Sequence, residues 1–531
     1  MAEKIKVPAG VYDMVTRCME QEFPDNVAIR YVAEDGKTVV EKHYREYARD
    51  IRKMVSYLKN EVPDLKGRSV VLLSRNCYEF CVASYGIILA GGVLVTLNQK
   101  KTWEELEYEL GLVEPALILN DGIDYGCRAE LEAAYGPKLR PMDCYKETAP
   151  GELTNCVGHD DLMMLMFTSG TTGRSKGVML SERNMCASLH TYSEVAENWI
   201  TNRLPAGQKL PLSHMTLLPL FHMACFVCVM SYPPAGWALN LCGDIRDFYR
   251  DLGLMHSDAI AVAPMLMEAI YKDVKRGRRA RLNGVWNPCG SSAMFDGAML
   301  AELAQQGMMI TQVYGMTETC GDGIINYEQD EKHIRAVGKP DDHAEYKLDE
   351  TGEICIRGGC VMLGYYKDPE ATAEVLDADG WFHTGDLARV DEDGFYYITG
   401  RKKNIIILDN GENVSPEELE NLLSNVIKYA MRNSRIYVDI FKMDGYGVLV
   451  MKNISATPID FDETRLTERF VRGDASRTTE GSGLGLSITQ SLAEIQGGTF
   501  GIQVDGDLFK AIVSIPLWEE DEEEENEVDT L

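Results

Sequence analysis

The sequence predicts a multidomain α/β protein, and three observations support this fold class. A chain of 531 residues suits two to four domains with sizeable cores. The apolar run Leu162–Phe167 reads as a buried strand, and after the polar loop that follows it Ser181 is placed to cap a helix beginning near Glu182. A second apolar run, Met308–Val313, also ends in a polar motif. Strands that alternate with helices in this way are typical of α/β folds.

The loop FTSGTTGRSKG, residues 167–177, has the composition of a phosphate-binding loop. Its glycines let several backbone N–H groups turn toward one point, its hydroxyls add donors, and Lys176 adds a positive charge. A flexible Ser/Gly linker is the alternative, but such linkers rarely place a lysine after so dense a Thr/Gly cluster. We therefore expect an ATP-using enzyme. The expected phosphate contacts are Thr168, Ser169, Gly170, Thr171, Thr172, Gly173 and Lys176.

Two later motifs make this interpretation more specific. In YGMTET, residues 314–319, Thr317 can bond a phosphate oxygen and Glu318 is a carboxylate suited to Mg²⁺. In WFHTGDLARVDEDGFYYITGR, residues 381–401, Asp386 can accept hydrogen bonds from ribose hydroxyls and Arg401 can approach the same sugar. Taken singly, Glu318 reads as a surface acid and Asp386 as a turn residue. Three such motifs in this order argue against chance.

Charge and hydropathy exclude other classes of function. The net charge of −30 argues against nucleic acid as a partner, although part of that charge lies in the acidic tail Glu519–Asp529. No secretory signal opens the chain, and the apolar stretch Leu217–Met230 is too short for a transmembrane helix. Fourteen cysteines are scattered without a repeating framework, and Cys225 and Cys228, inside an apolar segment, read as buried thiols. We expect a reducing, cytoplasmic setting.

With four further motifs, these residues resemble the adenylate-forming superfamily, and most of all its long-chain fatty acyl-CoA synthetases, over residues 1 to about 420. The further motifs are Leu73–Gln99, LPLFH at 218–222, GSSAM at 290–294 and TGEICIRG at 351–358. The resemblance implies an adenylate-forming core of two α/β subdomains and a small β-barrel over residues 1–400. A hinge and the start of a truncated lid would follow over residues 401–420.

The resemblance also implies site roles and a two-step reaction. Gly290, Ser291 and Ser292 would lie along the adenine, Tyr314 would stack on it, and Lys403 would be the hinge of the lid. His222 would line the acyl pocket, although by itself it reads as a core imidazole. A carboxylic acid, here a fatty acid, would attack MgATP to give acyl-AMP, and coenzyme A would then displace AMP. Thr168, Lys176, Thr317, Glu318 and His222 would be the catalytic residues.

The carboxy-terminal part departs from that superfamily. In the superfamily, the lid ends in a Gly-Lys motif that acts in adenylation. No Gly-Lys follows Gly411 in this chain. Instead, Ser415 and Glu418 form a capping box, and an apolar helical face follows Pro416. Asn421, Asn425 and Lys428 share another stripe of that helix, which reads either as a solvated face or as a Mg-phosphate site.

NLLSNVIKYA, residues 421–430, together with residues 465–498, resembles the ATPase domain of sensor histidine kinases. By this likeness Asn425 would bind Mg²⁺, and the nucleotide contacts would be Asn421, Lys428, Tyr429, Gly481, Gly483, Leu484 and Gly485. The implied α/β sandwich of the GHKL type covers residues 421–517, and a disordered acidic tail covers residues 518–531. Most such domains carry an Asp-rich loop for the adenine, and this chain has Lys452–Ser455 in its place, so Asn453 is the only candidate substitute. Because the phosphorylated histidine helix is absent from the sequence, autophosphorylation in cis is not expected.

The two resemblances meet within Glu418–Leu423, which indicates a fusion, whether by recombination, by an error of sequence assembly or by design. The first functional hypothesis is an AMP-forming acid–thiol ligase that uses ATP, Mg²⁺ and coenzyme A, impaired by loss of the lid lysine. The alternative is a nucleotide-binding fusion protein with little ligase turnover, and a signalling kinase is a third reading. The expected partners are a small carboxylic acid and coenzyme A, with a homodimer left open.

Overall fold

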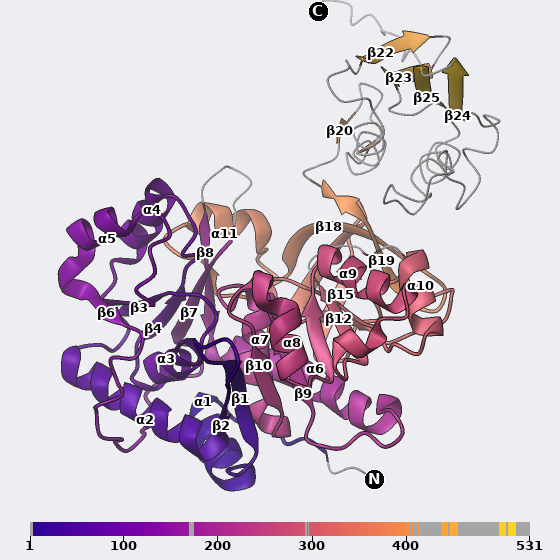
Figure 1. Ribbon diagram of the computed structural model, residues 1–531. Helices are drawn as coiled ribbons and strands as arrows, with labels where there is room; N and C mark the ends of the chain where they lie inside the picture. The colour runs from indigo at the N-terminus through magenta and orange to yellow at the C-terminus, as the bar shows by residue number, and fades with distance from the viewer. Residues whose placement is uncertain are drawn as a thin grey trace, which may run out of the picture. The chain divides into compact units, whose positions relative to one another are not determined.

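A computed structural model of the chain describes residues 4–168, 175–291, 295, 297–402, 406–407, 413–414, 437–443, 446–454, 499–505 and 508–516. The chain divides into two compact units (Figure 1). The first comprises Met1–Thr384 and Ala388–Ile398, and the second comprises Gly385–Leu387 and Thr399–Leu531. The predicted phosphate loop and the YGMTET motif belong to the first unit, and Asp386 and Arg401 belong to the second.

A seven-stranded sheet in the first unit carries the predicted phosphate loop. Its order is β17-β8-β7-β4-β3-β5-β6, with parallel pairing from β7 to β6 and antiparallel pairing of β8 and β17. The strands are β3 (Ser69–Leu73), β4 (Val93–Thr96), β5 (Leu117–Asn120), β6 (Leu139–Pro141), β7 (Leu162–Thr168), β8 (Lys176–Ser181) and β17 (Gly364–Tyr365). The strand predicted at Leu162–Phe167 is confirmed as β7.

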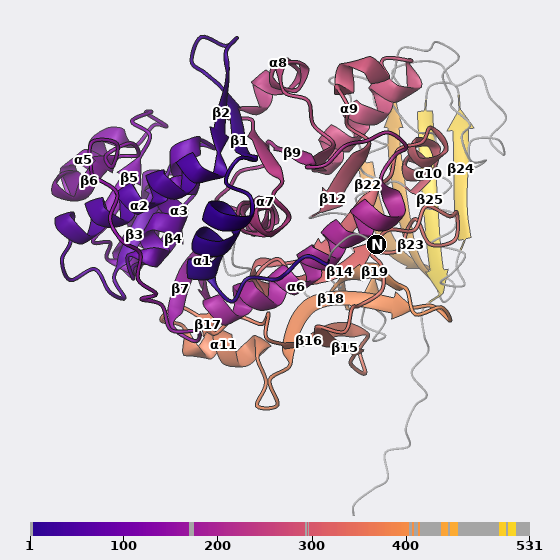
Figure 2. The same ribbon diagram turned by 90° about the horizontal axis from the view of Figure 1, so that it is seen from below.

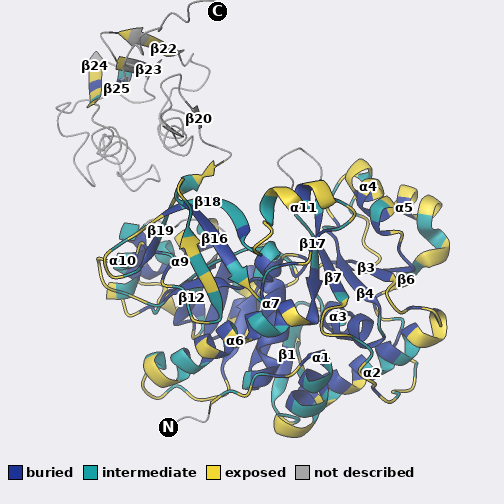
Figure 3. Ribbon diagram, turned by 180° about the vertical axis from the view of Figure 1, so that it is seen from behind, coloured by how far each residue is buried: buried dark blue, intermediate teal, exposed yellow. Residues whose placement is uncertain are grey.

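Helices cover both faces of this sheet, because its central strands are apolar on both sides. Val71 and Leu73 of β3 belong to a core shared with α4 (Trp103–Val113) and α5 (Arg128–Tyr135). Val70 and Leu72 belong to a core shared with α3 (Tyr78–Leu89) and α2 (Tyr44–Glu61). Figure 3 shows β3, β4 and β7 as buried strands. Such two-sided burial is typical of parallel sheets.

An eight-stranded sheet in the order β14-β13-β12-β11-β9-β10-β1-β2 forms the other half of this unit. It is parallel from β13 to β1, and β14 and β2 are antiparallel edge strands. The strands are β1 (Val27–Val32), β2 (Val39–His43), β9 (Ser213–Thr216), β10 (Ala238–Leu241), β11 (Ala259–Val262), β12 (Asn287–Ser291), β13 (Thr311–Gly315) and β14 (Gly323–Asn326). The strand expected at Met308–Val313 therefore begins three residues later and includes Tyr314.

The two sheets share one hydrophobic core. Helix α7 (Met223–Ser231) is buried along almost its whole length and, with α6 (Glu182–Asn198), joins residues of both sheets in that core. The opposite face of the eight-stranded sheet packs on α8 (Phe248–Leu254), α9 (Pro264–Lys275) and α10 (Gly297–Gln305). The short α1 (Val11–Asp13) and the π-helix Met14–Glu22 add to the shared core.

A smaller sheet takes the place of the predicted barrel. Its order is β15-β16-β18-β19, with β15 and β19 as outer strands, so the described strands form a curled sheet rather than a closed barrel (Figure 2). The strands are β15 (Ala344–Leu348), β16 (Glu353–Gly358), β18 (Phe382–Val390) and β19 (Tyr396–Arg401). Helix α11 (Pro369–Val375) lies between β17 and β18 in the sequence and packs against β17.

The second unit contains a four-stranded antiparallel sheet in the order β22-β23-β25-β24. Its strands are β22 (Tyr437–Met443), β23 (Tyr446–Ile454), β24 (Thr499–Asp505) and β25 (Leu508–Pro516), and β20 (Ile406–Ile407) pairs with β21 (Asn413–Val414). Asn453 lies near the end of β23, opposite Phe509. The helix expected after Pro416, the predicted glycine-rich segment and the acidic tail lie outside the described residues.

Two expectations from composition can be compared with the structure. All fourteen cysteines are free thiols within the described residues, and Cys225 and Cys228 are buried on α7 as expected. Among the described helices, none is both long and apolar enough to cross a membrane. The cytoplasmic setting expected from the cysteines stays a prediction.

Candidate active site

The predicted phosphate loop connects β7 to β8, which pair antiparallel. Thr168 is the last residue of β7 and pairs with Lys176, the first residue of β8. The connection therefore begins and ends at adjacent positions on two neighbouring strands. Beyond the hairpin, Ser181 caps α6, since its hydroxyl oxygen accepts a hydrogen bond from the Asn184 backbone N–H at 3.3 Å. The helix start predicted near Glu182 is confirmed.

Lys176 and Glu318 are connected by a tyrosine that the sequence motifs did not include. The Lys176 Nζ lies 4.8 Å from the centre of the Tyr365 ring. The Tyr365 hydroxyl donates a hydrogen bond of 3.0 Å to the Glu318 Oε1. A cation, an aromatic ring and a carboxylate are thus brought together from three distant parts of the sequence.

Backbone hydrogen bonds hold this trio in place. Tyr365 lies on β17, which pairs with β8, and the Tyr366 N–H donates to the Gly177 carbonyl at 2.7 Å. Glu318 lies on a short 3₁₀ helix, Thr317–Thr319, and its carbonyl accepts from the Met362 N–H at 2.8 Å. The segment 362–366 therefore fixes both the lysine strand and the glutamate turn.

The predicted adenine residues lie at the carboxyl ends of neighbouring parallel strands. Gly290 and Ser291 end β12, opposite Gln312 and Val313 of β13, and Tyr314 follows on β13. A Cβ atom at Gly290 would lie 2.4 Å from a carbon of the Phe295 ring, so a side chain at this position would displace the phenylalanine. Ligands of open α/β sheets bind at this edge, beyond the carboxyl ends of the strands.

His222 immediately precedes α7, and its side chain is exposed rather than a core imidazole. The ring lies 4.4 Å from the Phe221 ring, measured between centres. Crowding around the ring, and then the positive charge of Lys101, lower the pKa of His222. The neutral imidazole is therefore favoured near neutral pH.

Lys101 is a second cation beside the loop that the sequence motifs did not include. Its Nζ donates a 3.0 Å hydrogen bond to the Ser175 hydroxyl and pairs with the buried carboxylate of Glu109. Ser175 directly precedes Lys176, so the Lys101 side chain contacts the chain next to Lys176.

Asp386 and Arg401, predicted to share the ribose, are already paired. The Arg401 Nε donates to the Asp386 Oδ1 at 2.8 Å, with the aspartate side chain 7% exposed and the arginine 63% exposed. The pair joins β18 to β19 in the curled sheet.

The remaining predicted site residues, and the side chain of Ser291, lie outside the described part of the chain. These residues are Ser169, Gly170, Thr171, Thr172, Gly173, Ser292, Lys403, Asn421, Asn425, Lys428, Tyr429, Gly481, Gly483, Leu484 and Gly485. Their roles stay predictions.

Tyr365 and Lys101 carry only weak sequence signals. Tyr365 belongs to GYYKDPEAT, seven residues after the TGEICIRG motif, and a tyrosine there reads as ordinary strand packing. Lys101 precedes the helix cap Thr102 and reads as a surface lysine. Only the three-dimensional fold shows that both approach the hairpin.

The two α/β sheets, with lysine and carboxylate held together at their strand ends, define an AMP-forming acid–thiol ligase fold. Residues 17–366 match the family model described as AMP-binding enzyme, and the chain belongs to that family. Residues 417–525 match the model of the histidine kinase-, DNA gyrase B- and HSP90-like ATPases, so a domain of that family follows.

Curated relatives and solved structures are similar over most of the chain. The long-chain-fatty-acid–CoA ligase of Salmonella typhimurium is 28% identical over 438 residues, covering 72% of this chain and 76% of the relative. The corresponding ligase FadD15 of Mycobacterium bovis is 28% identical, covering 67% and 69%. The o-succinylbenzoate CoA synthetase of Bacillus subtilis, solved with its acyl-adenylate, has a TM-score of 0.67 at 24% identity, covering 81% and 85%. This last likeness shows the fold.

Proposed function

We propose that the chain activates a carboxylic acid with MgATP as an acyl-adenylate and transfers the acyl group to coenzyme A. The observation that carries the proposal is the Lys176–Tyr365–Glu318 trio at the edge of the loop hairpin. Phosphate binding needs positive charge, and a Mg²⁺ ion needs a carboxylate oxygen. The trio places both next to the segment predicted to hold the triphosphate.

The residues present fit Mg²⁺, because Glu318 offers a hard oxygen ligand and Tyr365 fixes one of its oxygens by hydrogen bonding. When bound, Mg²⁺ would neutralise negative charge on the phosphates. Lys176 would oppose the remaining charge, and Thr168 and Thr317 would donate hydroxyl hydrogen bonds to phosphate oxygens. This assigns catalysis to positioning and electrostatics, since the substrate carboxylate is itself the nucleophile.

The adenine would lie along Gly290, Ser291 and Ser292 against Tyr314, and the ribose would contact Asp386 and Arg401. His222, neutral near pH 7, would stand at the carboxylate end of the acyl pocket. We propose a fatty acid as the substrate, because long-chain-fatty-acid–CoA ligases are among the relatives at 28% identity. Coenzyme A would serve as the thiol.

A second candidate function rests on the carboxy-terminal domain. No Gly-Lys follows Gly411, and the match to the histidine kinase-like ATPases begins at residue 417, where the rest of a ligase lid is expected. In this alternative the first part binds ATP with little ligase turnover, and the second part binds another nucleotide.

Exchange of labelled pyrophosphate into ATP, measured with a panel of carboxylic acids, tests the adenylation step. We expect exchange that depends on a fatty acid and falls at least about tenfold in Lys176→Ala, because a charge-assisted phosphate contact is lost. Lys209→Ala is the matched control, since Lys209 is an exposed lysine in a distant loop.

The exchange rate separates the two candidates. Exchange with wild-type protein at rates ordinary for ligases would contradict the low-turnover alternative. Intact MgATP binding without exchange on any acid would instead contradict the ligase. Normal exchange by Lys176→Ala would remove that lysine from the site.

A further inference from the structure

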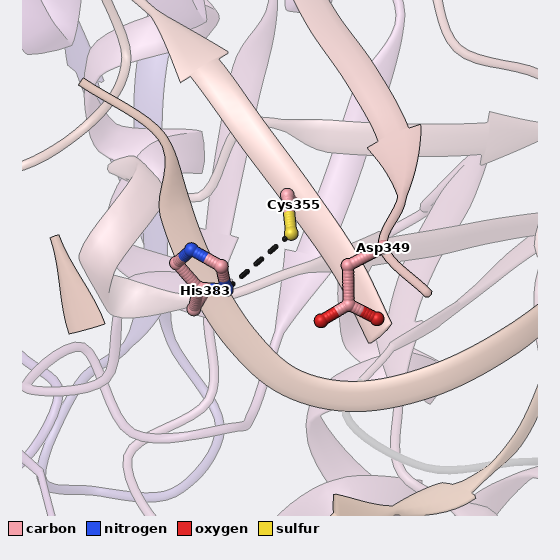
Figure 4. Close-up of side chains that lie close together, drawn as sticks. All are labelled: Asp349, Cys355 and His383. Carbon is pink, nitrogen blue, oxygen red and sulfur yellow. Dashed lines mark hydrogen bonds between the residues drawn. The ribbon is translucent and has the colours of Figure 1, made fainter. Parts of the chain in front are cut away.

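A cluster of metal-ligand side chains lies on the curled sheet, apart from the candidate active site. Cys355 of β16, His383 of β18 and Asp349, which follows β15, each offer a ligand atom, and these three atoms lie within 4.8 Å of one another (Figure 4). Glu353, two residues before Cys355, faces the same imidazole. Cys355 is fully buried and Glu353 is 4% exposed.

The distances in this cluster match those between ligands of one zinc ion. The Cys355 Sγ lies 3.5 Å from the His383 Nδ1, and the Glu353 Oε2 lies 3.3 Å from the same nitrogen. Zn–S bonds of about 2.3 Å and Zn–N or Zn–O bonds of about 2.0 Å place tetrahedral ligands about 3.5 Å apart for S and N and about 3.3 Å apart for N and O.

Hydrogen bonds and a bound cation are two ways to hold these groups together. The Nδ1 atom carries at most one proton, and it cannot donate to both the Cys355 sulfur and the Glu353 carboxylate. The Cys355 thiol also lies 3.7 Å from the Glu353 carbonyl, which gives it an alternative acceptor. A cation can bind the Cys355 sulfur, the His383 nitrogen and an Asp349 oxygen at once, since these atoms lie within 4.8 Å of one another.

Neighbouring groups orient the ligands. The His383 Nε2 lies 3.6 Å from the Asp377 Oδ2, and a metal-bound histidine often has a carboxylate beside its other ring nitrogen. The Asp349 Oδ1 accepts hydrogen bonds from the backbone N–H groups of Thr351 and Glu353, at 2.8 and 2.9 Å. These hydrogen bonds therefore fix the position of the Asp349 carboxylate within the cluster.

We propose that Asp349, Cys355 and His383 bind a zinc-class divalent cation, with Glu353 beside the His383 ring. One thiolate, one imidazole and carboxylate oxygens are a ligand set for Zn²⁺ rather than for Mg²⁺, which prefers oxygen alone. The ion would fasten the start of β18 to the β15–β16 hairpin. All three ligands come from strands or turns of one sheet in the first unit.

Titration of the full-length chain with Co²⁺ in the absence of nucleotide tests the site. Cobalt replaces zinc and absorbs in the near ultraviolet when a thiolate is bound, so we expect this band to saturate at one ion per chain. Cys355→Ser should abolish the band. Cys360→Ser should keep it, because Cys360 is a buried thiol nearby that is not in the cluster.

Asp349→Asn keeps the assignment testable if Cys355→Ser does not fold. The asparagine oxygen can still accept the turn hydrogen bonds, whereas the anionic ligand is lost, so cobalt affinity should fall at least about tenfold. Zn²⁺ should displace the cobalt and raise the Tm of the wild-type chain but not that of Asp349→Asn. A wild-type chain without the thiolate band, or a band that survives in folded Cys355→Ser, would overturn the proposal.

Discussion

At the scale of single residues, Tyr365 performs two tasks with two parts of one side chain. Its ring faces the Lys176 ammonium, and its hydroxyl donates to Glu318. Burial, and then the charge of Glu318, raise the pKa of Tyr365 far above its ordinary value. The phenol therefore remains a hydrogen-bond donor throughout the physiological pH range, and Glu318 keeps one fixed oxygen.

We predict that Tyr365→Phe raises the KM for MgATP by about tenfold, because an outer-shell partner of a metal-binding carboxylate is lost. The ring and its contact with Lys176 remain, so folding should be unchanged. Pyrophosphate exchange at varied MgATP measures the effect, and Tyr366→Phe, the next residue, is the control. Equal KM values for the two variants would show that Tyr365 does not orient Glu318.

Asp322, which ends the turn after Glu318, is a buried acid with an unusual pKa. Burial, and then the neighbouring carboxylate of Asp341, raise the pKa of Asp322 to about 7. Between the unfolded value of 3.8 and about 7, the folded chain holds more protons at this site than the unfolded chain does. The free energy of unfolding therefore falls as the pH rises through this window.

We predict that Asp322→Asn removes this contribution, because asparagine resembles the protonated acid. From pH 5 to pH 7, wild-type chain should lose stability relative to the variant by up to about 1.4 kcal/mol per pH unit. Urea denaturation of both chains across that range provides the measurement. A stability difference that does not change with pH would contradict the raised pKa.

At the scale of elements, α6 depends on its first turn. Ser181 is fully buried, and its hydroxyl both accepts from the Asn184 N–H and donates to the Asn184 Oδ1, at 3.3 and 3.0 Å. The helix follows directly on β8, which begins with Lys176. A poorly capped α6 would therefore loosen the strand that carries the lysine.

We predict that Ser181→Ala lowers the free energy of unfolding by about 1 to 2 kcal/mol, the usual cost of losing an N-cap. Ser188→Ala on the same helix is the matched control. Its buried hydroxyl has no hydrogen-bond partner within the described residues, so its removal should be neutral or stabilising. Denaturant unfolding followed by circular dichroism compares the two variants. Equal losses of unfolding free energy would show that the Ser181 cap does not stabilise the helix.

The elements around the loop could be predicted because their determinants are local. The strand at Leu162–Phe167 follows from an unbroken apolar run, and the start of α6 follows from a serine before a helical pattern. Tyr365 and Lys101 could not be predicted as site residues. The position of Tyr365 depends on strand pairing across 100 residues or more of intervening sequence, and the position of Lys101 depends on side-chain contacts. We expected a small barrel, and the structure has a curled sheet instead. No local sequence pattern determines whether the outer strands of a sheet close into a barrel.

At the scale of the whole molecule, two family matches divide the chain near residue 417. The first contains the Lys176–Tyr365–Glu318 trio, and the second would contain the predicted Asn425 site. If both parts bind nucleotide, the chain has two sites that differ in their residues.

We predict that calorimetry detects two MgATP sites per chain. Lys176→Ala should weaken one of them by about ten- to a hundredfold, because a charge-assisted contact is lost. Asn425→Ala should weaken only the other and leave pyrophosphate exchange unchanged. One site, or exchange that also depends on Asn425, would contradict this division.

Strand β17, which carries Tyr365 and pairs with β8, precedes Arg401, the last residue of the curled sheet, in the sequence. Every side chain of the trio is therefore supplied by the portion of the gene upstream of the point where the second family begins. A recombination event near residue 417 could exchange everything downstream and leave the charged groups at the loop intact. The nucleotide recognition proposed for the first part can in this way outlast the replacement of a neighbouring module.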